Sequence, residues 1–317
     1  MLRKISRSNT ATGVAAFLAL AGSLAACRAT ATPQVPATPT VAPIAAATPT
    51  PMPWILVGAD TSPEVQEAVS VWGEARGLEV RVEPIDGQPQ GVPPGLQAVV
   101  GMEPGIRGVH DRWSAADIVI VVVNPVSLGP GERTSVIGPT VSYEHAGFLA
   151  GMAAGLATSS GGVGLTPGGG EAAETFALGF EEGVRYACPK CRLEQVPVPA
   201  RPPFGVDVVG IGPDPDPLGD EEVGGVPWLI VTGDAELGGW GDRLTARVRE
   251  SPEALVGPAI ERLLNGSPGE AWAYTAENGG LRVEVVDGRA ISPGRERLLR
   301  EAEARLASGL LVIGGGV

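Results

Sequence analysis

The residues best suited to chemistry are two cysteines three positions apart. Cys188 and Cys191 have the C-x-x-C spacing of disulfides, redox centres and zinc sites. One such pair supplies only part of the ligand set of zinc, and neither His110 nor His145 stands near it. The pair also follows a helical pattern, and the end of a helix does not favour a thiolate as its start does. A local disulfide is therefore favoured over a zinc site and over redox catalysis.

Other residues with catalytic potential stand in weak patterns. Residues 167–170 (Pro-Gly-Gly-Gly) lie between an expected strand and an expected helix, as a phosphate-binding loop does, but they lack the Lys and the Ser or Thr of a P-loop. A tight turn or a ligand-facing helix start is the simpler interpretation. The sequence contains no nucleophile elbow and no paired-carboxylate signature. We therefore expect a protein that is not an enzyme and that uses neither a metal nor a cofactor.

The N-terminus predicts export and lipidation at Cys27. Basic residues precede an apolar run over residues 12–24, which is too short to cross a bilayer comfortably. The run ends in Leu-Ala-Ala-Cys, which resembles the bacterial lipobox, so residues 1–26 are predicted to be a lipoprotein signal peptide. We expect Cys27 to carry a lipid anchor on the extracytoplasmic face of the bacterial cell membrane. Export also favours the Cys188–Cys191 disulfide, because that compartment is oxidising.

The segment after the lipobox has the composition of a stalk. Residues 28–53 are almost entirely Ala, Thr, Pro and Val, which cannot form a core and favour extended conformations. We therefore assign residues 27–53 to the lipidated cysteine and its stalk, and expect the folded part to begin near Trp54. The net charge of −13 repels phosphate backbones, so no nucleic-acid partner is expected.

Beyond Trp54, short β-branched runs alternate with helical patterns. Such runs are typical of parallel strands that helices cover on both faces. Strands are expected at residues 54–58, 78–83, 98–101, 118–123, 163–166, 193–198, 206–211 and 228–232, and helices at residues 62–76, 143–157, 172–186, 252–265 and 293–308. The pattern predicts an α/β fold of two Rossmann-like lobes with mostly parallel sheets. The N-terminal lobe would span residues 54–141, and the C-terminal lobe residues 142–317, including the crossings between lobes and a closing helix.

Several segments carry a family resemblance. Residues 142–154 (SYEHAGFLAGMAA), 176–184 (FALGFEEGV) and 225–234 (GVPWLIVTGD) are the main ones, and the similarity covers most of residues 118–313. In these segments the chain resembles the basic membrane protein family of substrate-binding lipoproteins, whose members look like type I periplasmic binding proteins. The resemblance implies a monomeric, lipid-anchored binding protein that delivers purine nucleosides or related small molecules to the permease of an ABC importer.

In the N-terminal lobe the resemblance implies two ligand residues. Asp60 follows the first strand and matches the opening Asp of a family segment, while Asn124 falls where the family has an Asp after its fourth strand. An amide pairs with a base edge through other donors and acceptors than a carboxylate does. The family's stacking Phe and its Asn are Pro63 and Glu64 here, so the ligand preference is expected to differ.

In the C-terminal lobe the matches are Phe176 for an aromatic residue, Asp234 for an acid and Arg249 for a Lys. Each also has an ordinary explanation: Phe176 as a core residue, Asp234 as a turn or cap residue, and Arg249 as half of a surface ion pair. Trp240, in a Gly-rich segment, is a candidate to replace the missing stacking Phe.

Proline and glycine replace helices in three segments of the family pattern. Residues 83–98, 198–206 and 212–224 are too rich in proline and glycine for the helices expected there. We therefore expect a reduced family member whose sheet faces are less covered. An alternative function follows, in which the fold serves as a surface interaction or sensor module without transport.

Overall fold

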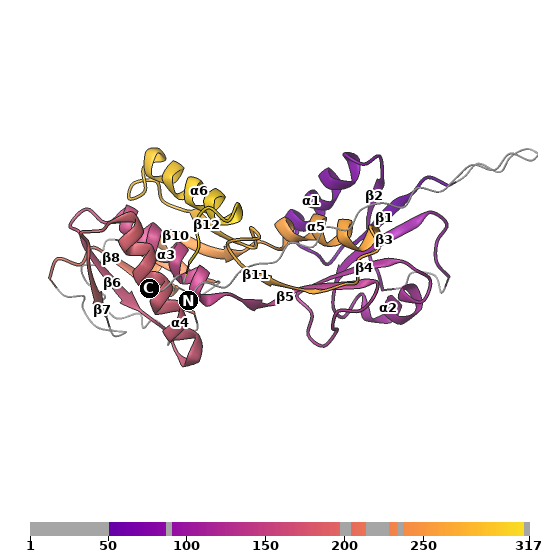
Figure 1. The fold of residues 1–317 in the computed structure, drawn as a ribbon, viewed down its shortest axis with the longest axis horizontal. Coiled ribbons are helices and arrows are strands. Elements are labelled where there is room, and N and C mark those ends of the chain that lie inside the picture. The colour runs from indigo at the N-terminus through magenta and orange to yellow at the C-terminus, as the bar shows by residue number, and fades with distance from the viewer. Residues whose placement is uncertain (1–50, 87–90, 197–203, 214–227, 234–236, 314–317) are drawn as a thin grey trace, which may run out of the picture. The chain divides into compact units, whose positions relative to one another are not determined.

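A computed structural model describes residues 51–86, 91–196, 204–213, 228–233 and 237–313. The predicted signal peptide, Cys27 and nearly all of the predicted stalk lie outside the described residues. Two six-stranded, mostly parallel sheets with flanking helices form the fold, which confirms the expected α/β class (Figure 1).

The first sheet has the strand order β11-β5-β4-β3-β1-β2, and its neighbouring strands run parallel. Its strands are β1 (Trp54–Gly58), β2 (Glu79–Glu83), β3 (Leu96–Met102), β4 (Val119–Val123), β5 (Thr134–Val141) and β11 (Ala271–Tyr274). The central strands β1 and β4 are buried over their whole length, as expected for continuous β-branched runs covered on both faces.

The second sheet has the order β12-β10-β9-β8-β6-β7, and only β12 runs antiparallel to its neighbour. Its strands are β6 (Gly162–Thr166), β7 (Arg192–Gln195), β8 (Val208–Ile211), β9 (Trp228–Thr232), β10 (Leu244–Glu250) and β12 (Leu281–Val285). Both sheets therefore place their first five strands in the same order, second-first-third-fourth-fifth.

The helices are α1 (Pro63–Glu74), α2 (Arg107–Ser114), α3 (Tyr143–Ala157), α4 (Gly170–Ala187), α5 (Pro252–Leu264) and α6 (Pro293–Ala307), with a 3-10 helix η1 (Gly238–Arg243). The first sheet is covered on both faces. Ile55 and Val57 of β1 pack in the core that contains α1 and α5, whereas Leu56 packs in the core that contains α2. Successive side chains of β1 therefore point to opposite faces of the sheet and pack in two separate cores.

Within the described residues, α-helices pack on one face of the second sheet. Ala246 and Val248 of β10 share a core with α3, α4 and α6. The other face carries a smaller cluster, in which strand residues such as Val209 and Val231 meet Leu237 and Leu244, and no member of this cluster is α-helical. The expectation of a less covered sheet face stays a prediction, because most of the segments that it concerns lie outside the described residues.

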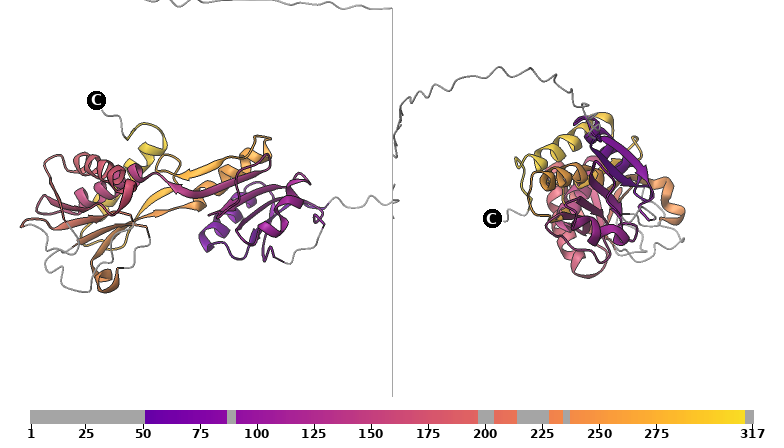
Figure 2. Two further views of the ribbon diagram at one scale, coloured as in Figure 1. Left: turned by 90° about the horizontal axis from the view of Figure 1, so that it is seen from below. Right: turned by 90° about the vertical axis from the view of Figure 1, so that its right-hand side faces the viewer.

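The chain returns to the first sheet after β10. Helix α5 packs against α1, and β11 extends the sheet beside β5, as Figures 1 and 2 show. The division at residues 141 and 142 stays a prediction. Strand pairing assigns β11 to the first sheet and α5 contacts β4 and β5 there, although both elements lie after residue 142. Local sequence patterns cannot show such a return, because pairing between distant strands leaves no periodic signal.

The loops that were expected in place of helices are only partly described. Residues 84–86 and 91–95 contain turn and extended conformations without a helix, and so do residues 204–207. Residues 87–90, 197–203 and 214–227 lie outside the described residues. Among the helices of the described ranges, none combines the length and the apolar character needed to span a membrane.

Candidate functional site

The shared strand order directs attention to one edge of each sheet. In open α/β sheets of this order, ligands bind beyond the carboxyl ends of the strands, where the chain direction around the sheet reverses. In the first sheet this point lies between β1 and β3. Asp60 follows β1 there with an exposed side chain, as predicted from its position in the sequence. A methyl group added to Gly105, in the loop after β3, would lie 3.1 Å from Asp60 Oδ2.

Helix α1 begins directly after Asp60. The Ser62 hydroxyl accepts a hydrogen bond from the backbone N–H of Val65 at 3.4 Å, and Pro63 occupies the first turn, where its missing N–H costs nothing. The pKa of the Glu64 carboxyl is lowered by the backbone N–H of that residue, then by the Ser62 side chain, with a smaller contribution from the Arg249 guanidinium. Glu64 thus lies within the electrostatic reach of a predicted ligand residue.

Asn124 follows β4, and its exposed side chain is held by a buried tyrosine. The Tyr274 hydroxyl donates a hydrogen bond to Asn124 Oδ1 at 2.6 Å, and the backbone N–H of Asn124 donates to the Ile137 carbonyl at 2.8 Å. Asn124 has a φ of 49°, a left-handed conformation that asparagine tolerates better than most residues. Burial, followed by the charges of Glu250 and Glu253, raises the pKa of Tyr274, so its hydroxyl stays protonated.

The loop after β4 is anchored by a carboxylate that the sequence analysis did not single out. Glu103, whose side chain is only 2% exposed, accepts hydrogen bonds from the backbone N–H groups of Val126, Ser127 and Leu128 at 2.9, 2.9 and 3.2 Å. Arg107 pairs with the same carboxylate. The loop beside Asn124 is therefore fixed by charge-assisted hydrogen bonds.

The corresponding edge of the second sheet is occupied by the protein itself. A Cβ on Gly168 would overlap the Pro213 carbonyl, and one on Gly212 would overlap the Pro167 carbonyl, so the loops after β6 and β8 touch through their backbones. Phe176 is fully buried in the core beside Phe180, with ring centroids 6.0 Å apart. Its position favours the core interpretation, because contact with a ligand would require the start of α4 to move.

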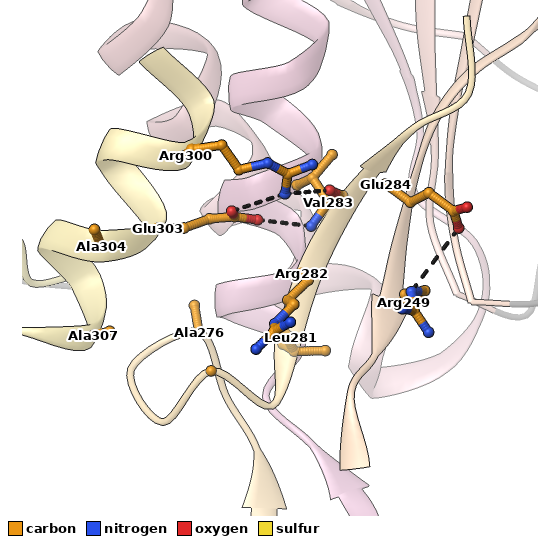
Figure 3. Close-up of a pocket in the computed structure, with 11 residues that line it drawn as sticks. Arg249, Ala276, Leu281, Arg282, Val283, Glu284, Arg300, Glu303, Ala304 and Ala307 are labelled. Carbon is orange, nitrogen blue, oxygen red and sulfur yellow. Dashed lines mark hydrogen bonds and ion pairs between the residues drawn. The ribbon is translucent and has the colours of Figure 1, made fainter. Parts of the chain in front are cut away.

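Arg249 is the next-to-last residue of β10 and has a partly exposed side chain. Its guanidinium lies 3.5 Å from the Glu253 carboxylate and 4.0 Å from that of Glu284. The register of β10 and β12 places Arg249 directly opposite Arg282, so two guanidinium groups share one face of the sheet. Both line a cavity of about 550 Å³ between β10, β12 and α6, shown in Figure 3.

Helix α6 closes the outer edge of β12 beside this cavity. The Arg300 guanidinium donates to the Val283 carbonyl at 2.7 Å, and the backbone N–H of Val283 donates to Glu303 at 2.8 Å (Figure 3). Side chains therefore supply the hydrogen bonds that a further strand would make.

The side chains of two predicted ligand residues, Asp234 and Trp240, lie outside the described part of the structure. Asp234 lies outside the described residues. Trp240 lies in η1, although the sequence predicted a loop there, and its side chain is not described.

The C-x-x-C pair forms a disulfide at the end of α4, between Cys188 and Cys191, with Cα atoms 5.3 Å apart. No group of three or more potential metal-binding side chains of His, Cys, Asp and Glu occurs within the described ranges.

The sequence analysis missed Tyr274, Glu103 and Arg282. Tyr274 reaches Asn124 across 150 positions of sequence, so no local pattern indicates the contact. Glu103 directly follows β3, at the sheet edge where ligand residues were expected, and this position could have identified it as a candidate. Arg282 belongs to an edge strand that was not expected.

No family model matches the chain, and no curated protein matches it. Among solved structures, the chain is similar to an ABC transporter system solute-binding protein from Conexibacter woesei DSM 14684, at 14% identity and a TM-score of 0.49, covering 83% of this chain and 98% of that one. It is also similar to a transcriptional activator of the comK gene from Bacillus halodurans, at 13% identity and a TM-score of 0.45, covering 81% and 98%. The periplasmic binding protein of an arabinose ABC transporter from Shewanella sp. ANA-3 is similar at 18% identity and a TM-score of 0.39, covering 80% and 97%.

Proposed function

We propose that this protein is an extracytoplasmic solute-binding protein that takes a small molecule between the carboxyl edges of its two sheets and delivers it to an ABC permease. The observation that carries the proposal is the shared strand order of the sheets, together with exposed or partly exposed polar side chains directly at strand ends: Asp60, Asn124 and Arg249. Lobes of this kind close around a ligand, and the closed form is what a permease would recognise.

The chemistry of these groups suits a small molecule with both hydroxyl groups and polar ring atoms. Asp60 accepts hydrogen bonds, as a sugar diol requires, whereas Arg249 and the Asn124 amide donate them. A purine nucleoside or a related compound offers both kinds of partner. It is the ligand class that we propose, in keeping with the resemblance of residues 142–154 and 176–184 to nucleoside-binding lipoproteins.

The N-terminal segment sets the proposed location. Cleavage before Cys27 and acylation of its thiol would anchor the protein to the outer face of the cell membrane, and residues 28–53 would act as a spacer. Replacing Cys27 by Ser should abolish incorporation of labelled palmitate and leave residues 1–26 uncleaved, because acylation and cleavage both require the lipobox cysteine. Wild-type protein that carries no label, or a Cys27→Ser variant that is still labelled and cleaved, would contradict this location.

A ligand screen on the detergent-solubilised lipoprotein tests the binding function. We expect a purine nucleoside at about 100 times its Kd to raise the melting temperature by several degrees, because such binding adds about 2.7 kcal/mol. Sugars, free bases and amino acids form the comparison set. By calorimetry, Asp60→Ala and Arg249→Met should each weaken binding at least about 10-fold. The control Asp111→Ala, which removes a fully exposed carboxylate on α2, should leave Kd unchanged.

A second candidate is a surface interaction or sensor module that binds no solute. The burial of Phe176 and the closed loops after β6 and β8 favour it, because the second lobe then contributes little to a ligand surface. A cooperative unfolding transition that no compound in the screen shifts would favour this candidate over the binding protein.

A further inference from the structure

The contact between Tyr274 and Asn124 joins three segments that are distant in sequence. The Tyr274 side chain is fully buried at the end of β11, and its hydroxyl lies 2.6 Å from Oδ1 of the exposed Asn124. The backbone of Tyr274 is itself fixed, because its carbonyl accepts a hydrogen bond from the N–H of Ser142 at 2.9 Å. A rigid, buried group thus holds one atom of an exposed amide.

The third segment leaves room for this contact by carrying a glycine. Gly138 of β5 has a φ of 80°, and a Cβ placed on it would lie 2.7 Å from Asn124 Oδ1 and 2.9 Å from Cε2 of Tyr274. Any larger residue would push the two side chains apart. The close approach and the backbone conformation therefore both require glycine at this position.

The hydrogen bond between Tyr274 and Asn124 determines which end of the Asn124 amide faces solvent. A protonated phenol donates its only hydrogen, and the amide oxygen of Asn124 accepts it. The amide nitrogen lies on the opposite side of the same carbon, turned away from Tyr274. The group that the exposed side chain then presents is an N–H donor.

We propose that Tyr274 is a positioning residue that makes Asn124 present its amide N–H groups, so that the ligand must place a hydrogen-bond acceptor against Asn124. This inference rests on the proposed function for the identity of the site and deepens it by naming the ligand's chemistry. Where the 6-position of a purine nucleoside faces Asn124, this amide favours a 6-oxo group, such as that of inosine, over a 6-amino group, such as that of adenosine.

The positioning role is tested without any ligand. In the Asn124→Asp variant, a hydrogen bond from Tyr274 stabilises the charged form of the introduced carboxyl group and lowers its pKa. We expect this pKa, measured by NMR titration, to rise by about one unit when Tyr274→Phe is added. The control Tyr186→Phe, on α4, should leave it unchanged. An unchanged pKa in the Tyr274→Phe double variant, with both proteins folded, overturns the proposal.

Selectivity is tested by calorimetry with inosine and adenosine as probes. The wild-type protein should bind inosine about 10-fold more tightly, Asn124→Asp should reverse the preference, and Tyr274→Phe should reduce it to about twofold without loss of the unfolding transition. A wild-type preference for adenosine would contradict the pairing of the Asn124 amide N–H with a 6-oxo group, and would overturn the proposal. Binding of neither probe would count against the proposed nucleoside function, and the titration alone would then decide the role of Tyr274.

Discussion

The two sheets share their strand order but differ at the ends of the equivalent strands. After β1 and β3 the first sheet carries Asp60, exposed, and Glu103, buried and multiply hydrogen-bonded. After β6 and β8 the second sheet carries Gly168 and Gly212, each against a backbone carbonyl of the other loop. At the carboxyl edge, the loops of the first sheet thus carry carboxylates, whereas the loops of the second sheet pack against each other through their backbones.

This difference shows that topology alone does not create a ligand site. The same strand order leaves a crevice at both edges in principle, but close backbone contact fills it in the second sheet. Under the proposed function, the groups that the second sheet offers to a ligand come from strands further along, such as Arg249 near the end of β10.

The helices that cover the two sheets also differ, in how closely their backbones approach each other. In α3 and α4 a Cβ on Gly147 or Gly151 would overlap backbone of α4, and one on Gly179 or Gly183 would overlap backbone of α3. The two helices therefore touch through their backbones. In the first lobe, the atoms nearest to a Cβ on Gly257 of α5 belong to the Trp72 side chain of α1, the first of them at 2.8 Å.

The largest expected effect comes from Gly151→Ala. A methyl group there would meet the Phe180 carbonyl, which cannot move without shifting α4, so we expect a loss of about 3 kcal/mol or more in the free energy of unfolding. Gly257→Ala should cost clearly less, because the partly exposed indole of Trp72 can turn away. Urea denaturation of both variants measures the difference.

Gly108→Ala is the matched control for these variants. Gly108 lies in α2, and apart from its chain neighbours and the backbone of its own helix no atom lies within 4 Å of its would-be Cβ. This substitution should stabilise the protein by about 0.4–1 kcal/mol, since alanine restricts the unfolded chain. Equal losses for Gly151→Ala and Gly257→Ala would contradict the contrast between the two lobes.

The next effect concerns the carboxylate that fixes the loop after β4. Glu103→Gln removes the charge that accepts three backbone N–H groups and pairs with Arg107, and we expect it to lower the free energy of unfolding by about 2 kcal/mol. Chemical denaturation measures this, with Glu67→Gln, an exposed position on α1, as the control. A loss below about 0.5 kcal/mol would show that water replaces these hydrogen bonds.

The second lobe has a weaker counterpart in Asp207. Its carboxylate is partly desolvated, which opposes ionisation, but hydrogen bonds from Thr158, Ser159 and Ser160 prevail and lower its pKa. The folded protein therefore gains stability from this group above the unfolded pKa of about 3.9 and loses it as the pH falls through the folded pKa.

Asp207→Asn tests this gain. Because the group is largely solvated, the variant should lose less than about 1 kcal/mol at pH 6, and the difference from wild type should shrink below about pH 4. Thermal unfolding between these pH values measures it. A difference that persists in acid would show that the charge of Asp207 is not the cause.

Buried elements with simple patterns were predictable from the sequence. Helix α3 has the bounds that its apolar, small-residue run predicted, and β9 likewise begins and ends where expected. β10 and β12 were missed because charged residues interrupt their apolar pattern, and β5 because Gly138 and Pro139 resemble a turn.

The site was less predictable, because its geometry depends on distant contacts. Asp60 and Asn124 could be placed at strand ends, since that requires only the strand assignment. The burial of Phe176 depends on how α4 docks on α3, and the orientation of Asn124 depends on β11, which joins the sheet from a distant part of the chain.

The smallest expected effect concerns the last strand of each sheet. β11 joins the first sheet in parallel, whereas β12 joins the second in antiparallel register, with Arg282 opposite Arg249 and Glu284 opposite Arg247. Like charges on directly opposite residues destabilise a sheet by a few tenths of a kcal/mol, and opposite charges stabilise it by as much. Arg282→Gln should therefore stabilise the protein by about 0.3 kcal/mol, and Glu284→Gln should destabilise it by about the same amount. Both shifts should vanish in about 1 M salt, where screening removes exposed charge interactions. Shifts of the same sign in the two variants would show that the side-chain stems, not the charges, determine the stability of this edge.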